Sequence, residues 1–360
     1  MGLNIQSRAL KYGYANSRVK AMKGLLLDSG TYDEMIRVKT TDGMIELLQR
    51  TSYKGDFLGE GGDTGSQVVE IASAKNFSKT VRKILRFTPE SDRPAVDALL
   101  RKWNILNMKT LIHAKQQGMS YREVKPYLFD IGGLSESDAE RIMKAEGDEL
   151  FNELKKTELG KEMLSVSTAD FSKNMRDIFN NALKNMNTFL QAESIIDAYA
   201  YLFMDKGLSE VGGKEITSIR RIMKKEIDAK NILIVERLKK YQFGKEEIQK
   251  YLIRGGTLKP SFVEKLIDAP DRQLSLSLIK SRFRKLDVKE NPRLVDLEMA
   301  LEKALAAEKA TAFHRTILSL GVILGFILLK ETEMHNVRKV AKAKEFNIPE
   351  QEVRDMLVIV

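Results

Sequence analysis

The chain of 360 residues contains no cysteine, only seven prolines, three histidines and one tryptophan. Without cysteine the protein forms no disulfide, uses no thiol in catalysis and has no zinc site built on sulfur, which is compatible with a reducing compartment. Aromatic residues make up only 7% of the chain, and no stretch shows the alternation of a half-buried strand. The composition therefore favours helices rich in Lys, Glu, Leu and Ala, and predicts an all-α fold.

Charge of both signs is abundant, with 60 Lys and Arg against 50 Asp and Glu and a net charge of +10. This balance permits an acidic partner, an anionic membrane surface or nucleic acid. Local clusters such as Arg220, Arg221, Lys224 and Lys225 are more typical of solvated helix faces than of docking sites. A hydrophobic content of 43% in a chain of this length is enough for two or three domains with buried cores.

No motif predicts an active site. His113, His314 and His335 have no second histidine or carboxylate at a spacing typical of metal ligands. The glycine-rich stretch 54–66 lacks the GxxxxGK[ST] pattern that cradles phosphate, and no nucleophile motif is present. We therefore expect no catalytic residue, no cofactor, no metal and no small-molecule substrate.

One stretch is apolar enough to raise the question of a membrane span. Residues 316–329 (TILSLGVILGFILL) form a nearly continuous run of fourteen residues, whereas spanning a bilayer takes about twenty. A buried central helix is the better interpretation. The N-terminus lacks the apolar core of a signal peptide, so we expect a protein that is not exported.

The chain contains a repeated pattern centred on asparagine. Positions one, four and seven after each Asn are apolar, which predicts a helix with one buried stripe. Ser120-x-x-Glu123 then predicts a capping box at the start of a second helix. An Asn beside a buried stripe is expected to make structural hydrogen bonds. The shared positions are Asn107, Asn231 and Asn336, each with a Lys eight residues on (Lys115, Lys239 and Lys344) and a Glu sixteen residues on (Glu123, Glu247 and Glu352).

A fourth, weaker copy is predicted near the N-terminus. It aligns on Arg18, with a capping box at Thr31-x-x-Glu34, because Asn16 lies two residues too early. Paired glycines at 132–133 and 255–256 predict tight C-terminal caps where the second helices end. The copies predict three similar helical domains, 1–92, 93–213 and 214–360, the last with closing helices at the C-terminus.

Several of these motifs resemble the C subunit of the archaeal and bacterial A/V-type ATP synthase, which is similar to the d subunit of the vacuolar ATPase. They are Tyr12-Gly-Tyr-Ala-Asn-Ser-Arg-Val-Lys-Ala-Met22, Asn107-Met-Lys-Thr-Leu-Ile-His-Ala-Lys115 and Glu331-Thr-Glu-Met-His-Asn-Val-Arg338. The resemblance spans the chain. It implies a funnel of three related domains in a pseudo-threefold arrangement. It also implies a non-catalytic rotor subunit, peripheral on the cytoplasmic face of the membrane, that couples the central stalk to the proteolipid ring and transmits torque.

The resemblance also implies structural signature positions that hold helices together. These are Arg18, Asn107, Lys109, Lys115, Asn231, Lys239, Asn336, Arg338 and Lys344. The residues alone leave two other hypotheses open: a helical adaptor that binds nucleic acid through basic faces, and a general helical scaffold for protein partners. The mixed charges argue against nucleic acid.

Overall fold

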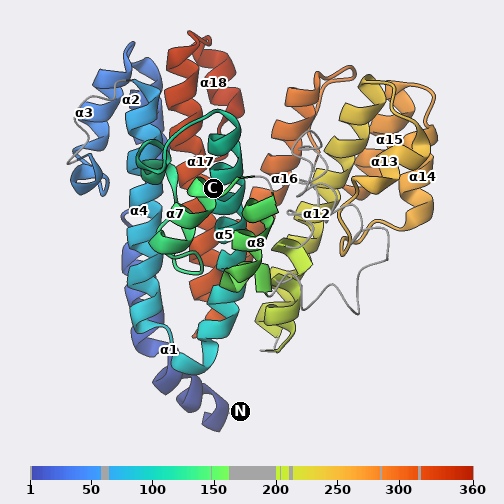
Figure 1. Cartoon of the computed structure of the whole chain (residues 1–360). Coiled ribbons are helices and arrows are strands. Elements are labelled where there is room, and N and C mark those ends of the chain that lie inside the picture. The colour runs from blue at the N-terminus through green and yellow to red at the C-terminus, as the bar shows by residue number, and fades with distance from the viewer. Residues whose placement is uncertain are drawn as a thin grey trace.

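The structure, a computed structural model, describes residues 2–57, 65–146, 148–161, 200–202, 204–210, 214–283, 286–314 and 318–359. Every regular element in these ranges is helical, so the predicted all-α fold is confirmed (Figure 1). The longer helices are α1 (Gly2–Lys23), α4 (Ser66–Phe87), α5 (Arg93–Gln116), α12 (Lys214–Lys240), α16 (Leu294–His314) and α17 (Leu320–Glu345). The shorter ones are α2 (Ser29–Arg37), α3 (Thr41–Leu48), α6 (Tyr121–Val124), α7 (Glu136–Lys144), α8 (Asp148–Lys156), α13 (Lys245–Lys250), α14 (Pro260–Asp268), α15 (Arg272–Arg282) and α18 (Glu350–Met356), with single 3₁₀ turns η1 (Lys54–Asp56), η2 (Glu90–Asp92) and η3 (Lys125–Tyr127).

Helix α17 lies at the centre of the molecule (Figure 1). It packs against α1, α4, α12 and α16. Its first ten residues, 320–329, are all buried, which confirms a central core helix for this part of the apolar run; residues 316–317 lie outside the described part. No helix among the described residues is long and apolar enough to cross a membrane.

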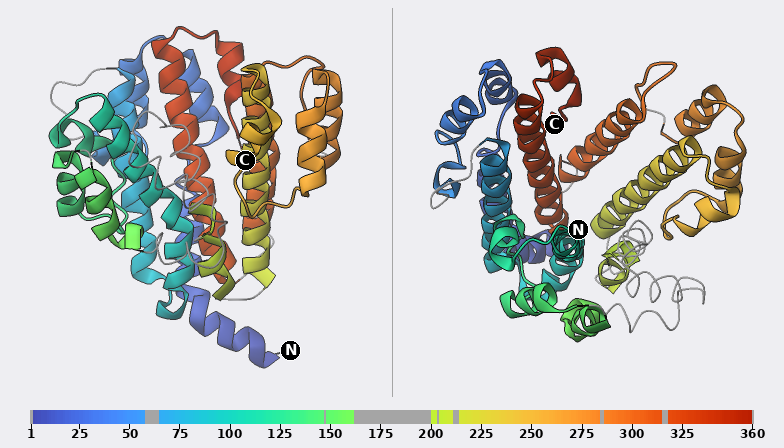
Figure 2. Two further views of the ribbon diagram at one scale, coloured as in Figure 1. Left: turned by 45° about the vertical axis from the view of Figure 1, so that its right-hand side comes forward. Right: turned by 45° about the horizontal axis from the view of Figure 1, so that its top comes forward.

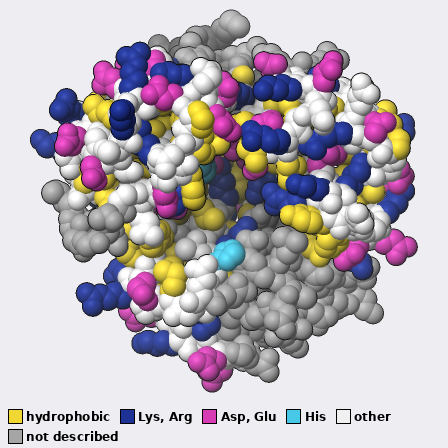
Figure 3. Space-filling view, turned by 90° about the horizontal axis from the view of Figure 1, so that it is seen from above, with side chains coloured by type: hydrophobic (Ala, Val, Ile, Leu, Met, Phe, Trp, Pro, Cys, Tyr) yellow, Lys and Arg dark blue, Asp and Glu magenta, His cyan; other side chains and the backbone are white. Residues whose placement is uncertain are grey.

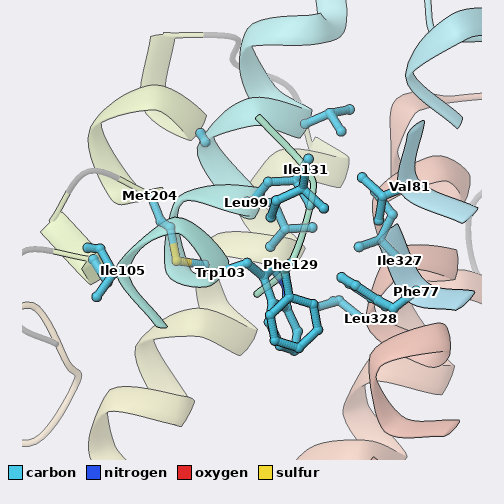
Figure 4. Packing of buried hydrophobic residues seen from close by; sticks show 14 of the residues in the cluster. Phe77, Val81, Leu99, Trp103, Ile105, Phe129, Ile131, Met204, Ile327 and Leu328 are labelled. Carbon is cyan, nitrogen blue, oxygen red and sulfur yellow. The ribbon is translucent and has the colours of Figure 1, made fainter. Parts of the chain in front are cut away.

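Buried apolar side chains form three clusters. The largest is built mainly by α1, α4, α5, α12 and the first half of α17. At its centre the rings of Phe77, Trp103 and Phe129 pack together, with centroids 4.5–6.0 Å apart (Figure 4). Trp103, the single tryptophan of the chain, is therefore a central residue of this core. A second cluster joins α12 to α13–α16, and a third joins the second half of α17 and α18 to α2 and α3.

The third cluster unites segments from the two ends of the chain. Tyr32 and Met35 of α2 are buried in it together with Val337 and Val340 of α17. The C-terminal copy of the repeat therefore packs on N-terminal helices as well as on α16, which precedes it in the chain. The boundary proposed at residue 92 stays a prediction, and the one at residue 213 lies outside the described part.

Candidate functional site: helix joints and a charged central cavity

Each repeated asparagine joins its long helix to a segment of extended chain 22 residues further on. Asn107 donates from Nδ2 to the Phe129 carbonyl at 2.8 Å and accepts the Phe129 amide at 2.7 Å. Asn231 makes the same two bonds to Ile253, both at 2.8 Å, and Asn336 makes them to Val358 at 2.8 and 3.1 Å. All three asparagines are buried. A carboxamide suits this position because it offers an acceptor to the backbone N–H and a donor to the backbone C=O of one buried residue.

Each repeated lysine joins the same long helix to the end of another helix. Lys115 donates to the carbonyls of Met143 and Ala145 at the end of α7, the first at 3.0 Å. Lys239 donates to Leu266 at 2.8 Å and to Ala269 at 3.0 Å at the end of α14. The last carbonyls of a helix have no partner within it and carry partial negative charge, so an ammonium group stabilises them.

Lys344 makes the equivalent joint across the two ends of the chain. Its ammonium group donates to Ile36 at 3.2 Å and to Val38, at the end of α2. Burial lowers the pKa of Lys344, and the nearby Glu350 carboxylate opposes that shift. Helix α2 thus occupies the place in the C-terminal copy that α7 and α14 occupy in the other two.

The predicted N-terminal copy is wrong in detail. Arg18 is exposed, with its guanidinium 5.9 Å from the Tyr14 ring centre. It is Asn16 that makes the two-way contact, donating to Ser319 at 3.1 Å and accepting its amide at 2.9 Å. A guanidinium group only donates and cannot accept a backbone N–H. The box at Thr31 is not formed either, because α2 begins one turn earlier, with Asp28 accepting the Thr31 amide.

The capping box at Ser120 and Glu123 is confirmed. The paired glycines, in contrast, do not cap helices. Gly132 and Gly133 have positive φ angles of 87° and 84° and follow the chain segment that Asn107 holds. A Cβ on Gly133 would lie 2.1 Å from the Asn104 amide nitrogen, and one on Gly256 would lie 2.3 Å from a carboxylate oxygen of Asp228. Glycine is required there because a polar side chain three residues before each Asn occupies the space.

Between α5, α12, α16 and α17 lies a cavity of about 350 Å³. Seen from above, it corresponds to the hollow near the middle of the molecule, where apolar and charged side chains meet (Figure 3). Its apolar lining includes Trp103, Leu106, Leu233, Leu301 and Leu305. Its charged lining is Lys102, Lys109, Glu226, Lys230, Glu298, Glu302, Lys309, Glu331 and Lys339.

Ion pairs tie the cavity walls together. Lys102 of α5 donates to Glu331 of α17 at 2.5 Å, and Lys309 of α16 donates to Glu226 of α12 at 2.6 Å. All four side chains are at most 15% exposed. Higher on the wall, Lys339 of α17 pairs with Glu302 of α16.

The two buried pairs share one electrostatic environment. Burial raises the pKa of Glu331, but the ammonium groups of Lys102 and Lys309 outweigh it and hold that pKa well below its usual range. Burial likewise raises the pKa of Glu226, and the ammonium groups of Lys309 and Lys102 lower it by more. Charged carboxylates are therefore the stable form at neutral pH, and the four helices are held by charge as well as by apolar packing.

Charged residues of α17 near its middle point in different directions. Glu333, two residues after Glu331, leaves the cavity and accepts hydrogen bonds from the Leu27 amide at 2.6 Å and the Tyr53 hydroxyl at 2.9 Å. Arg338 donates to Ser73 of α4 at 2.9 Å. The two carboxylates thus lie on different faces, as their spacing predicts, and do not share a proton.

The other positions that the sequence analysis singled out lie at the cavity wall, near its edge or outside the described residues. Lys109 lines the cavity, one helix turn above Leu106. His335 is half exposed, with its ring 6.1 Å from that of Trp103. Its Nε2 lies 3.7 Å from Glu331, four residues earlier, so the prediction that no carboxylate lies at such a spacing from a histidine is wrong for this pair. The side chain of His314 and residues 58–64 of the glycine-rich stretch lie outside the described part. Among the described residues no group of three or more His, Asp or Glu could hold a metal ion.

Sequence reasoning did not identify the residues that line the cavity, although α16 carries a signal for them. Glu298, Glu302, Leu305 and Lys309 recur every three to four residues and form one stripe. A stripe that mixes apolar residues with charged residues of both signs is typical of a helix face that lines a partly hydrated cavity. The fold and the site thus define a class of protein, an all-helical scaffold whose helices surround a charged central cavity.

Residues 15–356 match the ATP synthase (C/AC39) subunit family, and the chain belongs to that family. It is similar to the C subunit of the A-type ATP synthase of Methanosarcina acetivorans, with 27% identity over 97% of this chain and 93% of the relative. It is also similar to the C subunit of the A-type ATP synthase of Methanococcoides burtonii, with 25% identity over 97% of this chain and 94% of the relative. The C subunit of the V-type ATP synthase of Deinococcus radiodurans is 23% identical over 95% of this chain and 90% of the relative.

Proposed function

We propose that the protein is a non-catalytic rotor subunit of an A/V-type ATP synthase, which couples the central stalk to the membrane rotor ring. The observation that carries the proposal is family membership over residues 15–356. Relatives that align with almost the whole chain are named as the C subunit of an A-type or a V-type ATP synthase. In this role the protein transmits torque during ATP synthesis or ion pumping and is peripheral on the cytoplasmic face.

The central cavity is the proposed socket for the foot of the stalk. Its wall offers apolar contacts from Leu106, Leu233 and Leu301, next to charges of both signs. Such a surface suits the end of an amphipathic helix that carries its own charges, because apolar burial supplies affinity and complementary charges set the orientation. A pseudo-threefold funnel of three related units is part of this proposal, and the three Asn–Lys joints support it.

Torque transmission requires a stiff socket. The pairs Lys102–Glu331 and Lys309–Glu226 link α5 to α17 and α16 to α12. Removing one member of a buried pair strands the other charge at a cost of about 3–5 kcal/mol, so these links resist separation of the walls. Lys109 lines the cavity wall and is placed to meet the stalk.

Membership of the complex is tested by purifying the tagged protein from membranes in mild detergent, with a salt wash. Recovery of central-stalk proteins together with the ring proteolipid supports the proposal. Recovery of nucleic acid or unrelated soluble proteins, with neither of those partners, overturns it and favours the adaptor hypothesis.

The socket itself is tested by crosslinking, for which the absence of cysteine is useful because an introduced thiol is unique. Leu233→Cys places a thiol in the cavity wall, and Leu274→Cys places one on α15, where the native side chain is 46% exposed. In the purified complex a thiol-reactive crosslinker should join position 233, and not position 274, to a stalk protein. Equal yields from the two positions, or ring proteolipid joined to position 233, would refute the assignment.

A further inference from the structure

Helix α1 differs from the rest of the chain in its charge. The first acidic residue of the sequence is Asp28, so α1 carries five basic side chains and no acidic one. Five of the ten net positive charges therefore lie in 22 residues, whereas both signs are mixed elsewhere. The basic residues are Arg8, Lys11, Arg18, Lys20 and Lys23.

The first turns of α1 project from the body of the molecule (Figures 1 and 2). Every residue from 6 to 11 is exposed, and Leu10 is 89% exposed. Tyr14, one turn later on the same face, is 68% exposed. The opposite face packs into the core through Ala15 and Val19. The outer face of α1 thus presents Leu and Tyr to the surroundings.

The part of α1 next to the body of the molecule, around Lys11 and Tyr14, contacts the turn between α4 and α5. Tyr14 meets the ring of Phe87 edge-on at 6.4 Å, and Lys11 donates to Asp92 at 2.8 Å. Asp92 is thereby neutralised. Arg86 and Arg93 are exposed on either side of the turn, together with one acidic residue, Glu90. The net charge around the helix stays positive.

This end of the molecule lies opposite the mouth of the cavity. Figure 3 looks down on the hollow from above, whereas α1 projects at the lower end in Figure 1. A partner seated in the cavity therefore leaves α1 uncovered.

We propose that α1 binds the headgroups of anionic phospholipids, with Leu10 and Tyr14 in the interfacial layer and Arg18 and Lys20 beside the phosphates. A basic helix with an exposed apolar and aromatic face is the composition that lies in a membrane interface. Tyrosine suits that layer because its ring is apolar and its hydroxyl polar. The inference goes beyond the proposed function, since it requires lipid alone and no other protein.

The test uses the purified full chain and protein-free vesicles. Binding to vesicles of equal parts phosphatidylglycerol and phosphatidylcholine is compared with binding to phosphatidylcholine alone, at low and at high salt. The anionic vesicles should bind the protein, with an affinity that falls as salt rises. Each basic residue at such a surface contributes about fivefold to partitioning, so Arg18→Gln with Lys20→Gln should weaken binding about 25-fold.

Matched controls separate α1 from the general charge of the protein. Lys250→Gln with Lys280→Gln removes the same charge from exposed positions on other helices and should leave binding within about twofold. Leu10→Ser should weaken binding, whereas Phe346→Ser, at a side chain 68% exposed near the other end, should not.

Three results would overturn the inference. The first is equal binding to neutral and anionic vesicles, or to neither. The second is an α1 variant that binds as tightly as the wild type. The third is an α1 variant that binds vesicles normally but no longer recovers the rotor ring, which would assign the surface to a protein partner. Because the vesicles contain no protein, failure here leaves the recovery of stalk and ring proteins as a separate test of the proposed function.

Discussion

The Asn231→Ala substitution removes one of the three repeated joints and has a calculable cost. The side chain makes two hydrogen bonds to Ile253, each 2.8 Å long and buried. Without them the N–H and C=O of Ile253 lose their partners, at about 1–3 kcal/mol each when water does not enter. Asn231 is 6% exposed and Ile253 is 3% exposed, so access to water is poor. We expect a loss of about 3 kcal/mol in the local free energy of opening.

Hydrogen exchange at the Ile253 amide measures this loss directly. A change of about 3 kcal/mol corresponds to roughly 100-fold faster exchange, provided that exchange is limited by the opening equilibrium. Asn291→Ala, at an exposed asparagine, is the control and should leave exchange at Ile253 unchanged. The same substitution at Asn107 should accelerate exchange at Phe129. Exchange at Ile253 within about threefold of the wild type would show that the joint does not hold this segment.

Three further predictions concern the cavity and the glycine turn. Lys102→Met strands the Glu331 carboxylate and should destabilise the protein by about 3–5 kcal/mol in urea titrations, and adding Glu331→Gln should recover part of that loss. The pKa of Glu331 is depressed in the folded protein, so its carboxylate stabilises the fold fully above the pKa of the unfolded state. This stabilisation is lost as the pH falls through the folded pKa. The free energy of unfolding, measured from pH 7 into the acid range, should therefore fall less steeply in Glu331→Gln than in the wild type. Gly133→Ala should cost about 1–3 kcal/mol, because φ is positive and Asn104 occupies the Cβ position, whereas Gly13→Ala, in open space within α1, should stabilise by up to about 1 kcal/mol. A destabilised Gly13→Ala, or an unaffected Gly133→Ala, would contradict this reasoning.

The repeat was predictable from the sequence because its contacts are local. Each Asn binds the backbone N–H and C=O of a residue 22 positions away, and Lys115 and Lys239 reach helix ends within 30 residues. Because these contacts span about 30 residues or fewer, the contacting residues recur at the same spacing from one copy to the next. Aligning the chain with itself therefore reveals them. The capping box at Ser120 is more local still and was predicted residue by residue.

The N-terminal copy could not be predicted in the same way, because its partners are distant. Asn16 binds Ser319, 303 residues away, and Lys344 binds carbonyls of α2, 306–308 residues away. No offset within the chain relates Asn16 to Ser319, so the alignment favoured Arg18 on its apolar neighbours and on the Thr31-x-x-Glu34 pattern. The residues that line the cavity were not identified for a related reason. Its four helices carry mixed stripes, but which stripes face one another depends on how the helices pack.

Helix α17 explains how a load on the cavity wall would reach the rest of the protein. Within eight residues it contacts α5 through Glu331, the N-terminal segments through Glu333, the C-terminal chain through Asn336 and α4 through Arg338. These side chains leave the helix in different directions because successive residues are rotated by about 100°. A force applied to one wall is therefore shared among all the elements that α17 touches. Four polar positions of the motif between Glu331 and Arg338 thus each hold α17 to a different part of the protein, and this physical demand accounts for their close spacing.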